Sequence, residues 1–210
     1  TLTVDTAPTG FDLVYDLTQS GGATCTFKEG TNTAVDTTTL TIAAGATTTT
    51  FFVTCAAASG AVDITATASQ EAAMAVTSID FAVQDAAPTI TGNFLGEGLL
   101  KDTISTQALT LTVDTAPTGF DLVYDLTETG GASCTFKEGS DVSTTTTLTI
   151  AAGATTTTFK VTCAAASGAV DITATASQEA AMAVTSIDFA VQSLAPTITG
   201  NFLGEGLLKD

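Results

Sequence analysis

Apolar and polar residues alternate with a period of two along most of the chain, which is typical of β-strands with one buried face. Over residues 109–113, two leucines and a valine alternate with threonines. In FDLVYDL at 120–126, Phe, Leu, Tyr and Leu share one face, opposite Asp, Val and Asp. Similar runs occur at 134–136, 148–150, 159–163 and 170–174, and we expect a last strand over 184–191. Turn signals such as APTG and AAGA separate these runs, so the pattern predicts an all-β fold.

The whole pattern occurs twice. TLTVDTAPTGFDLVYDL at Thr1–Leu17 returns unchanged at Thr110–Leu126, and Cys55–Asp102 matches Cys163–Asp210 at nearly every position. A repeat of about 108 residues has the size of one small β-sandwich domain, so we expect tandem antiparallel β-sandwiches. The repeats are out of phase with the ends of the sequence. We expect residues 1–85 to form a sandwich that lacks its first strand, residues 86–193 a complete sandwich, and residues 194–210 the leading strand of a following repeat.

One difference between the two copies indicates which face of a strand is buried. Phe52 in the first copy is replaced by Lys160 in the second, while both neighbours stay apolar. A position that accepts lysine points outward. Phe51, Val53 and Cys55 have the opposite parity and are therefore expected in the core.

Each copy contains one pair of cysteines on the inward parity, namely Cys25 with Cys55 and Cys134 with Cys163. Four cysteines permit three connectivities, and the repeated spacing favours one disulfide within each copy. Closing a loop of about 30 residues stabilises a fold by roughly 3–4 kcal/mol. Disulfides persist in oxidising compartments, so we expect an extracellular protein at the cell surface. Buried free thiols are the alternative, whereas a zinc site lacks both CxxC spacing and histidine.

The charge excludes several classes of function. A formal charge of −17 arises from 22 acidic residues and five lysines, with no arginine. Nucleic acid and anionic membrane surfaces are therefore not expected as partners, and no apolar run approaches the roughly 20 residues of a spanning helix. Histidine is absent, so no side chain of ordinary pKa titrates near neutrality. The carboxylates of Asp12 and Asp16 lie about 13 Å apart along one expected strand, too far to act as a glycosidase pair. We expect no enzymatic activity.

No metal or other cofactor is predicted, although calcium is an alternative. Glu97 and Asp102 are the best placed carboxylates for it, near a boundary between repeats, but isolated solvated carboxylates are the favoured interpretation. Threonine pairs such as Thr39 and Thr41 are typical of ice-binding or carbohydrate-binding surfaces. They are equally typical of the exposed face of any β-sandwich, which is the favoured interpretation.

Three segments carry a resemblance to a known family: APTGFDLVYDL, TTTLTIAAGATTTTFKVT and GAVDITATAS. They resemble bacterial immunoglobulin-like or Calx-beta-like modules of large surface proteins, over most of each repeat. The resemblance implies seven-stranded immunoglobulin-like sandwiches stacked end to end. For Calx-beta modules it also implies calcium in acidic loops.

These features favour a structural repeat of an extracellular filament or fibre. The alternative is a passive stalk of a large cell-surface adhesin whose ligand-binding domain lies elsewhere. In either case the expected partner is the protein itself, joined head-to-tail to neighbouring repeats or chains.

The phase of the repeat suggests how copies join. A sandwich built from residues 1–85 alone would expose a strand edge and an apolar groove. We expect residues 195–208 of one chain to complete the first sandwich of the next, by covalent continuity or by donor-strand addition. The inserted side chains would be Ile198, Phe202 and Leu207, which match Ile90, Phe94 and Leu99 within the chain.

Overall fold

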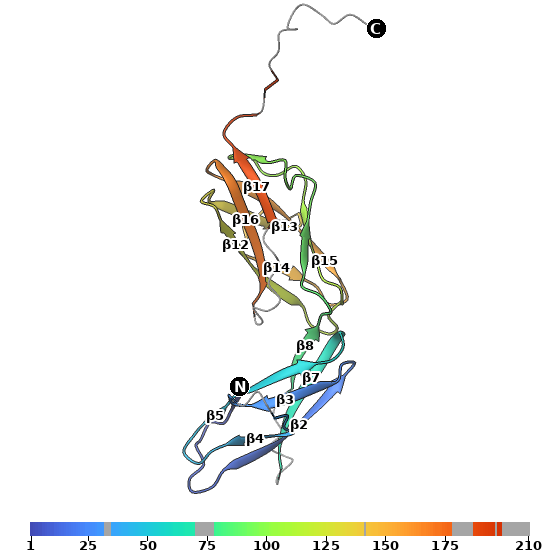
Figure 1. Cartoon of the computed structure of the whole chain (residues 1–210), viewed down its shortest axis with the longest axis vertical. Coiled ribbons are helices and arrows are strands. Elements are labelled where there is room, and N and C mark those ends of the chain that lie inside the picture. Colours follow the sequence, from blue (N-terminus) through green and yellow to red (C-terminus); the bar gives the residue numbers. More distant parts are fainter. Residues whose placement is uncertain (32–34, 70–77, 141, 178–186, 196, 199–210) are drawn as a thin grey trace, which may run out of the picture.

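The computed structural model of the chain describes residues 1–31, 35–69, 78–140, 142–177, 187–195 and 197–198. All regular structure in these residues is β-strand, which confirms the all-β fold. The strands form two bodies, one from each half of the chain, arranged end to end (Figure 1). In each body two layers of sheet enclose a hydrophobic core.

The first body contains eight strands among the described residues. They are β1 (Leu2–Thr3), β2 (Leu13–Gly21), β3 (Cys25–Glu29), β4 (Thr39–Ile42), β5 (Thr48–Thr49), β6 (Phe51–Cys55), β7 (Ser59–Ala68) and β8 (Ile79–Val83). One layer is the sheet β4-β2-β7-β8, and the other comprises the pairs β1-β5 and β3-β6. All of these pairings are antiparallel.

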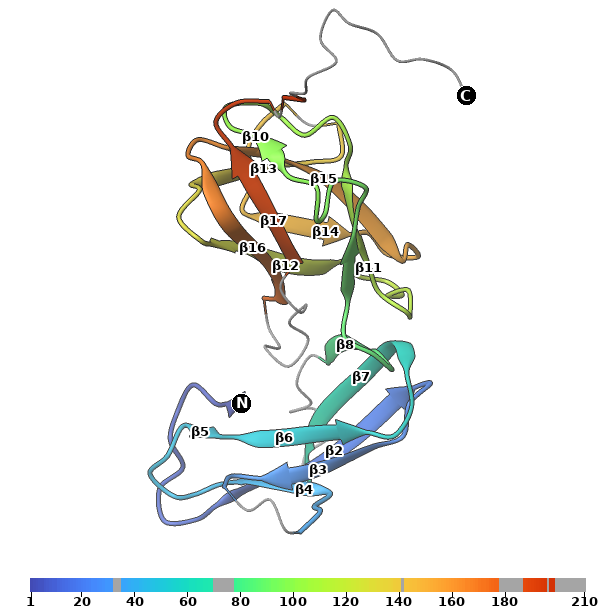
Figure 2. The same cartoon turned by 45° about the horizontal axis from the view of Figure 1, so that its top comes forward.

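The second body has the equivalent strands, with β5 and β6 replaced by the single strand β15, and two more strands at its start. Its strands are β9 (Thr89–Thr91), β10 (Leu99–Leu100), β11 (Leu109–Thr112), β12 (Leu122–Thr129), β13 (Cys134–Glu138), β14 (Thr147–Ile150), β15 (Thr156–Cys163), β16 (Ser167–Ala176) and β17 (Ile187–Gln192). The sheets β10-β17-β16-β12-β14 and β13-β15-β11-β9 form its two layers (Figure 2). The last strand runs one residue beyond the expected 184–191, and residues 184–186 lie outside the described part.

The period-two alternation matches the burial of the side chains. In β12, Tyr124 and Leu126 are buried whereas Val123 and Asp125 are exposed, because successive strand residues point to opposite faces. Phe52 is exposed, as its replacement by lysine in the second copy predicts. The alternate residues of β6, Phe51, Val53 and Cys55, are half-buried. Their counterparts in β15 are fully buried.

The AAGA turns are fixed by a glycine and a carboxylate. Gly45 has φ of +85°, a conformation that glycine adopts at little cost. Its N–H donates to the carbonyl of Pro8 at 2.8 Å. The Asp12 carboxylate, which precedes β2, accepts a hydrogen bond from the Ala44 N–H at 2.8 Å. The equivalent contacts recur in the second body.

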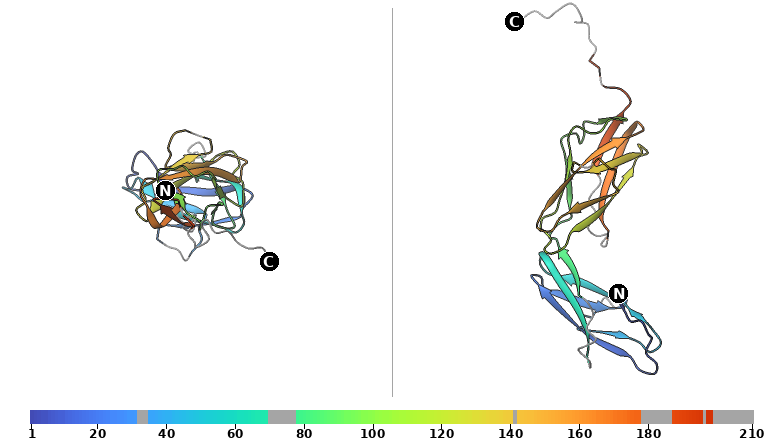
Figure 3. Two further views of the ribbon diagram at one scale, coloured as in Figure 1. Left: turned by 90° about the horizontal axis from the view of Figure 1, so that it is seen from above. Right: turned by 180° about the vertical axis from the view of Figure 1, so that it is seen from behind.

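The two bodies meet at a polar junction, where the end of β8 lies against the loop that precedes β12 (Figure 3). The Gln84 side chain pairs with one residue of that loop: its Nε2 donates to the Thr115 carbonyl and its Oε1 accepts from the Thr115 N–H, both at 2.9 Å. The Asp114 carboxylate accepts from the N–H groups of Asp85 at 2.9 Å and Ala86 at 3.0 Å. The junction is therefore held by specific hydrogen bonds.

A glycine permits close approach at the same junction. The Thr118 N–H donates to the Gly60 carbonyl at 2.7 Å. A Cβ atom added to Gly60 would lie 2.2 Å from the Ala116 carbonyl oxygen and 2.7 Å from the Thr118 Oγ1. Any larger residue at position 60 would therefore push the two bodies apart.

Candidate functional site: the open side of the first sandwich

Two disulfides join neighbouring strands, one in each body. Cys25 bonds to Cys55 between β3 and β6, and Cys134 bonds to Cys163 between β13 and β15. This is the connectivity expected within each repeat, and none of the four cysteines is free. In both pairs the cysteines lie directly opposite each other, with Cα atoms 4.0 Å apart. Each bond therefore links two strands of one sheet, whereas the conserved disulfide of antibody domains joins two sheets.

Residues 87–100, which precede β11, cover one side of the second sandwich and are called the covering segment below. Strand β9 pairs antiparallel with β11, so Ile90 lies opposite Leu111. Strand β10 pairs parallel with β17, so Leu99 lies opposite Val191. Because β11 and β17 belong to different layers, the segment passes from the edge of one sheet to the edge of the other.

Phe94 lies between these two short strands and fills the space between the layers. Its ring packs edge-to-face on Phe189 with centroids 5.5 Å apart. Ile90, Phe94 and Leu99 are all buried and belong to the same core cluster as both sheets. The covering segment is therefore part of the hydrophobic core of the second sandwich.

The corresponding side of the first sandwich is open. Among the described residues, no strand pairs with the outer edge of β8, and β1 pairs with β5 alone. Phe81 and Val83 of β8 are only half-buried, although their counterparts Phe189 and Val191 are buried. Ile79 is 52% exposed. The two sandwiches have nearly the same sequence here, so the difference reflects the covering segment.

A groove of about 300 Å³ lies between the layers on this open side. Both layers contribute to it, and its apolar lining includes Leu2, Leu17, Phe51, Ile64 and Ile79. An apolar groove beside unpaired strand edges is the arrangement to which an extended segment adds as a further strand. The groove is therefore the candidate functional site of the chain.

Of the residues expected to fill such a groove, the structure describes Ile198, which lies outside both cores. Ile198 is 99% exposed, and the nearby Leu194 is also exposed. Phe202 and Leu207 lie outside the described residues. Ile198 therefore packs in neither sandwich of its own chain, unlike its counterpart Ile90.

Ser105 is a structural residue that the sequence pattern does not reveal. It is the one buried polar side chain in the described part of the chain. Its Oγ accepts from the Val161 N–H at 3.2 Å, and its own N–H donates to the Val161 carbonyl at 2.8 Å. Ser105 thereby satisfies the backbone of β15 and extends the cover of the second sandwich.

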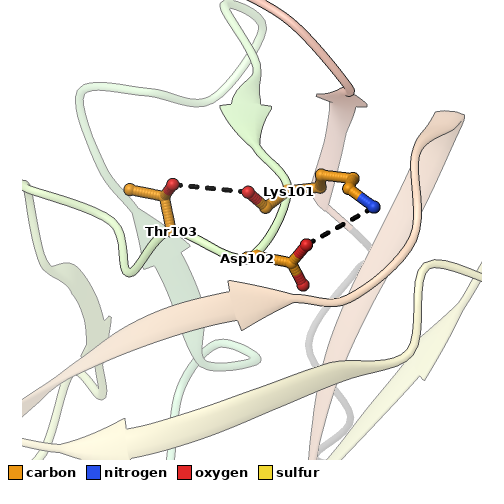
Figure 4. Close-up of polar contacts among 3 residues, drawn as sticks. All are labelled: Lys101, Asp102 and Thr103. Atoms are coloured by element: carbon orange, nitrogen blue, oxygen red, sulfur yellow. Dashed lines mark hydrogen bonds and ion pairs between the residues drawn. The ribbon is translucent and has the colours of Figure 1, made fainter.

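Of the two carboxylates expected as calcium candidates, that of Asp102 pairs with a lysine. The Asp102 carboxylate lies 3.4 Å from the Lys101 ammonium (Figure 4). The Asp102 N–H donates to the Cys163 carbonyl at 2.8 Å. The Glu97 N–H donates to the Phe94 carbonyl at 3.0 Å, within the covering segment. In the part of the chain that the structure describes, no three His, Cys, Asp or Glu side chains lie close enough to hold a metal ion.

Other carboxylates brace the sandwiches. The Glu138 Oε1 on β13 accepts from the Thr149 N–H on β14 at 2.6 Å and from the Thr157 hydroxyl on β15 at 2.9 Å. Because β14 belongs to the opposite layer, this carboxylate links the two sheets. Glu29 makes the equivalent contacts in the first sandwich. These glutamates have a structural role.

One acidic pair faces solvent on each sandwich. Asp63 lies opposite Asp80, and Asp171 lies opposite Asp188. A hydrogen bond with Asp171, together with its negative charge, raises the pKa of Asp188 above the usual range. A hydrogen bond with Asp63 is the main cause of the raised pKa of Asp80. Like charges directly opposite each other on a sheet are destabilising, so these pairs weaken the fold at neutral pH.

Comparison with known proteins gives no family assignment: no protein-family model and no curated protein matches the chain. Among the described residues, no helix is long and apolar enough to cross a membrane. The function is therefore inferred from the geometry of the two sandwiches.

Proposed function

We propose that the chain is a structural segment of an extracellular, cell-surface filament, built from immunoglobulin-like sandwich repeats joined head-to-tail. In this proposal the protein acts through assembly and has no catalytic role. The two disulfides support an oxidising, extracellular location. The resemblance to bacterial immunoglobulin-like modules supports the filament setting.

The observation that carries the proposal is the contrast between the open first sandwich and the covered second one. Residues 195–208 are identical in sequence to residues 87–100, which cover the second sandwich. On the first sandwich of a neighbouring copy, Ile198 would lie opposite Leu2, Phe202 would pack on Phe81, and Leu207 would lie beside Val83. Each contact reproduces one that the structure contains.

This contact generates a filament because donor and acceptor are different surfaces. A head-to-tail contact does not close on two copies, and it propagates unless the rotation between copies forms a ring. Each added copy would bury a strand edge and an apolar groove, which are the surfaces most prone to non-specific association.

Electron microscopy of the native material tests the proposal. A thread with a regular axial repeat along its whole length is expected. A thread that ends in a distinct head would favour the adhesin stalk, and isolated particles would contradict both. Native threads that separate into single chains in denaturant would indicate donor-strand addition, whereas larger polypeptides would indicate covalent continuity.

Sedimentation of the purified chain tests the role of the groove. Ile198→Asp places a charge on residues 195–208, the donor segment, and should abolish head-to-tail association. Val142→Asp is the matched control, because Val142 is also highly exposed and does not line the groove. Equal association of the two variants would refute groove insertion.

A further inference from the structure

We infer that the end of the second sandwich around Gly168 and Gln192 is a docking surface for the loop 5–9 of a second copy of this chain. The inference rests on the proposed head-to-tail assembly and adds a second contact to it, distinct from the groove. Both halves of the junction seen within the chain occur twice. Gly60 and Gln84 recur as Gly168 and Gln192, and the loop DTAPT at 114–118 recurs unchanged at 5–9.

The free copies of these surfaces are exposed where the paired copies are covered. Gln84 and Thr115 are half-buried in the junction, whereas Gln192 is exposed. Phe11, which follows the free loop, is 60% exposed, whereas its counterpart Phe120 is half-buried. The same side chains are thus available at the two outer ends of the described chain.

The internal junction specifies the contacts that docking would form. The Gln192 amide would pair with the N–H and carbonyl of Thr6, as Gln84 pairs with Thr115. The Asp5 carboxylate would accept from the N–H groups of residues 193 and 194. The Thr9 N–H would donate to the Gly168 carbonyl, as Thr118 donates to Gly60.

The differences between the two copies do not remove these contacts. Asp85 and Ala86 are replaced by Ser193 and Leu194. At these two positions Asp114 uses only backbone N–H groups, which every non-proline residue supplies. The docking surface therefore survives both substitutions.

Docking and groove insertion would reinforce each other. Residues 193–194 lead directly from the docking surface into the donor segment, so one contact holds the other at high effective concentration. The junction would also fix the orientation of successive chains, because it repeats the geometry between the two sandwiches of one chain (Figure 1). A constant axial repeat follows from this constraint.

Gly168→Val in the full chain tests the inference. A Cβ on Gly168 meets no described atom within 4 Å, so the single chain should keep its melting temperature. In the docked pair that Cβ would clash with the Ala7 carbonyl, as a Cβ on Gly60 would clash with Ala116. Sedimentation velocity should show that half-maximal association needs at least about tenfold more protein than the wild type does.

Ser193→Asp is the matched control, since it restores the residue found at position 85 and should associate like the wild type. Gln192→Ala should weaken association in the same direction as Gly168→Val. If Gly168→Val associates like the wild type while Ile198→Asp does not, the docking surface is refuted and groove insertion stands. If Ile198→Asp associates like the wild type, the proposed function fails instead. A wild-type chain that remains single at millimolar concentration contradicts both.

Discussion

Phe94 and Phe202 offer a matched pair of substitutions, because they occupy the same position in identical sequence segments. Phe94 is 8% exposed and packs edge-to-face on Phe189. Truncating a buried phenylalanine to alanine costs about 3–5 kcal/mol, of which an edge-to-face ring pair accounts for about 0.5–1.5 kcal/mol. We expect Phe94→Ala to lower the free energy of unfolding of the second sandwich by about this amount. Phe202→Ala should leave the dilute chain as stable as the wild type and should weaken association between chains.

Tyrosine fluorescence during urea denaturation measures this difference. Each sandwich contains one of the two tyrosines and the chain has no tryptophan, so Tyr15→Phe leaves Tyr124 as the reporter of the second sandwich. The Phe94→Ala and Phe202→Ala changes are compared in that background below the concentration at which chains associate. If Phe202→Ala destabilises the dilute chain as much as Phe94→Ala does, the donor segment packs within its own chain. If Phe94→Ala lowered the free energy of unfolding by less than about 1 kcal/mol, the covering segment would not be part of the core.

Four further predictions concern the two disulfides, the titrating groups Tyr124 and Asp188, and metal. Reduction should lower the free energy of unfolding of each sandwich by about 3–4 kcal/mol, since the bonds close separations of 30 and 29 residues; unchanged urea midpoints would contradict this. Burial, with a smaller contribution from the Asp114 charge, raises the pKa of Tyr124 to about 12. The fold favours the neutral form of Tyr124, and the stabilisation of the fold by this preference is complete below about pH 10 and lost as the pH rises toward 12. The urea midpoint of Tyr124→Phe should lack that pH-dependent loss. Asp188→Asn should raise the melting temperature at pH 7, because the raised pKa of Asp188 means that its ionisation weakens the fold as the pH rises. At pH 2 the carboxyls of Asp171 and Asp188 are both protonated, so an equal gain there would contradict a charge effect. Chelation of divalent cations should leave the melting temperature unchanged, and a fall of about ten degrees would direct attention to Glu97 and Asp102.

Much of the fold could be predicted from the sequence because period-two burial is a local property. The buried parity of β12 and the outward direction of Phe52 both follow from alternation and from one substitution between the copies. The pairing of Cys25 with Cys55 follows from the repeat, but their direct opposition on adjacent strands does not. Strand register depends on contacts between distant segments, which alternation alone does not encode.

The polar contacts were harder to predict, for the same physical reason. Ser105 and Glu138 resemble ordinary surface residues in the sequence, yet each meets a backbone group from another strand. Gln84 carries no motif, and its function appears only when the loop at Thr115 is brought beside it. Ile198 can be related to the buried Ile90 from the sequence alone, because the segment that contains each of them occurs twice; its insertion into a groove stays a prediction.

Hydrogen–deuterium exchange of the native material and of the isolated chain tests the proposed head-to-tail strand complementation most directly. In the isolated chain, the outward-facing amides of β1 and β8 should exchange quickly, because β1 pairs only with β5 and β8 only with β7 among the described strands. In the native material the same amides should become protected, while those of β11 and β17 remain protected in both samples as an internal reference. Equally fast exchange of β1 and β8 in both samples would show that nothing completes the first sandwich and would contradict head-to-tail strand complementation.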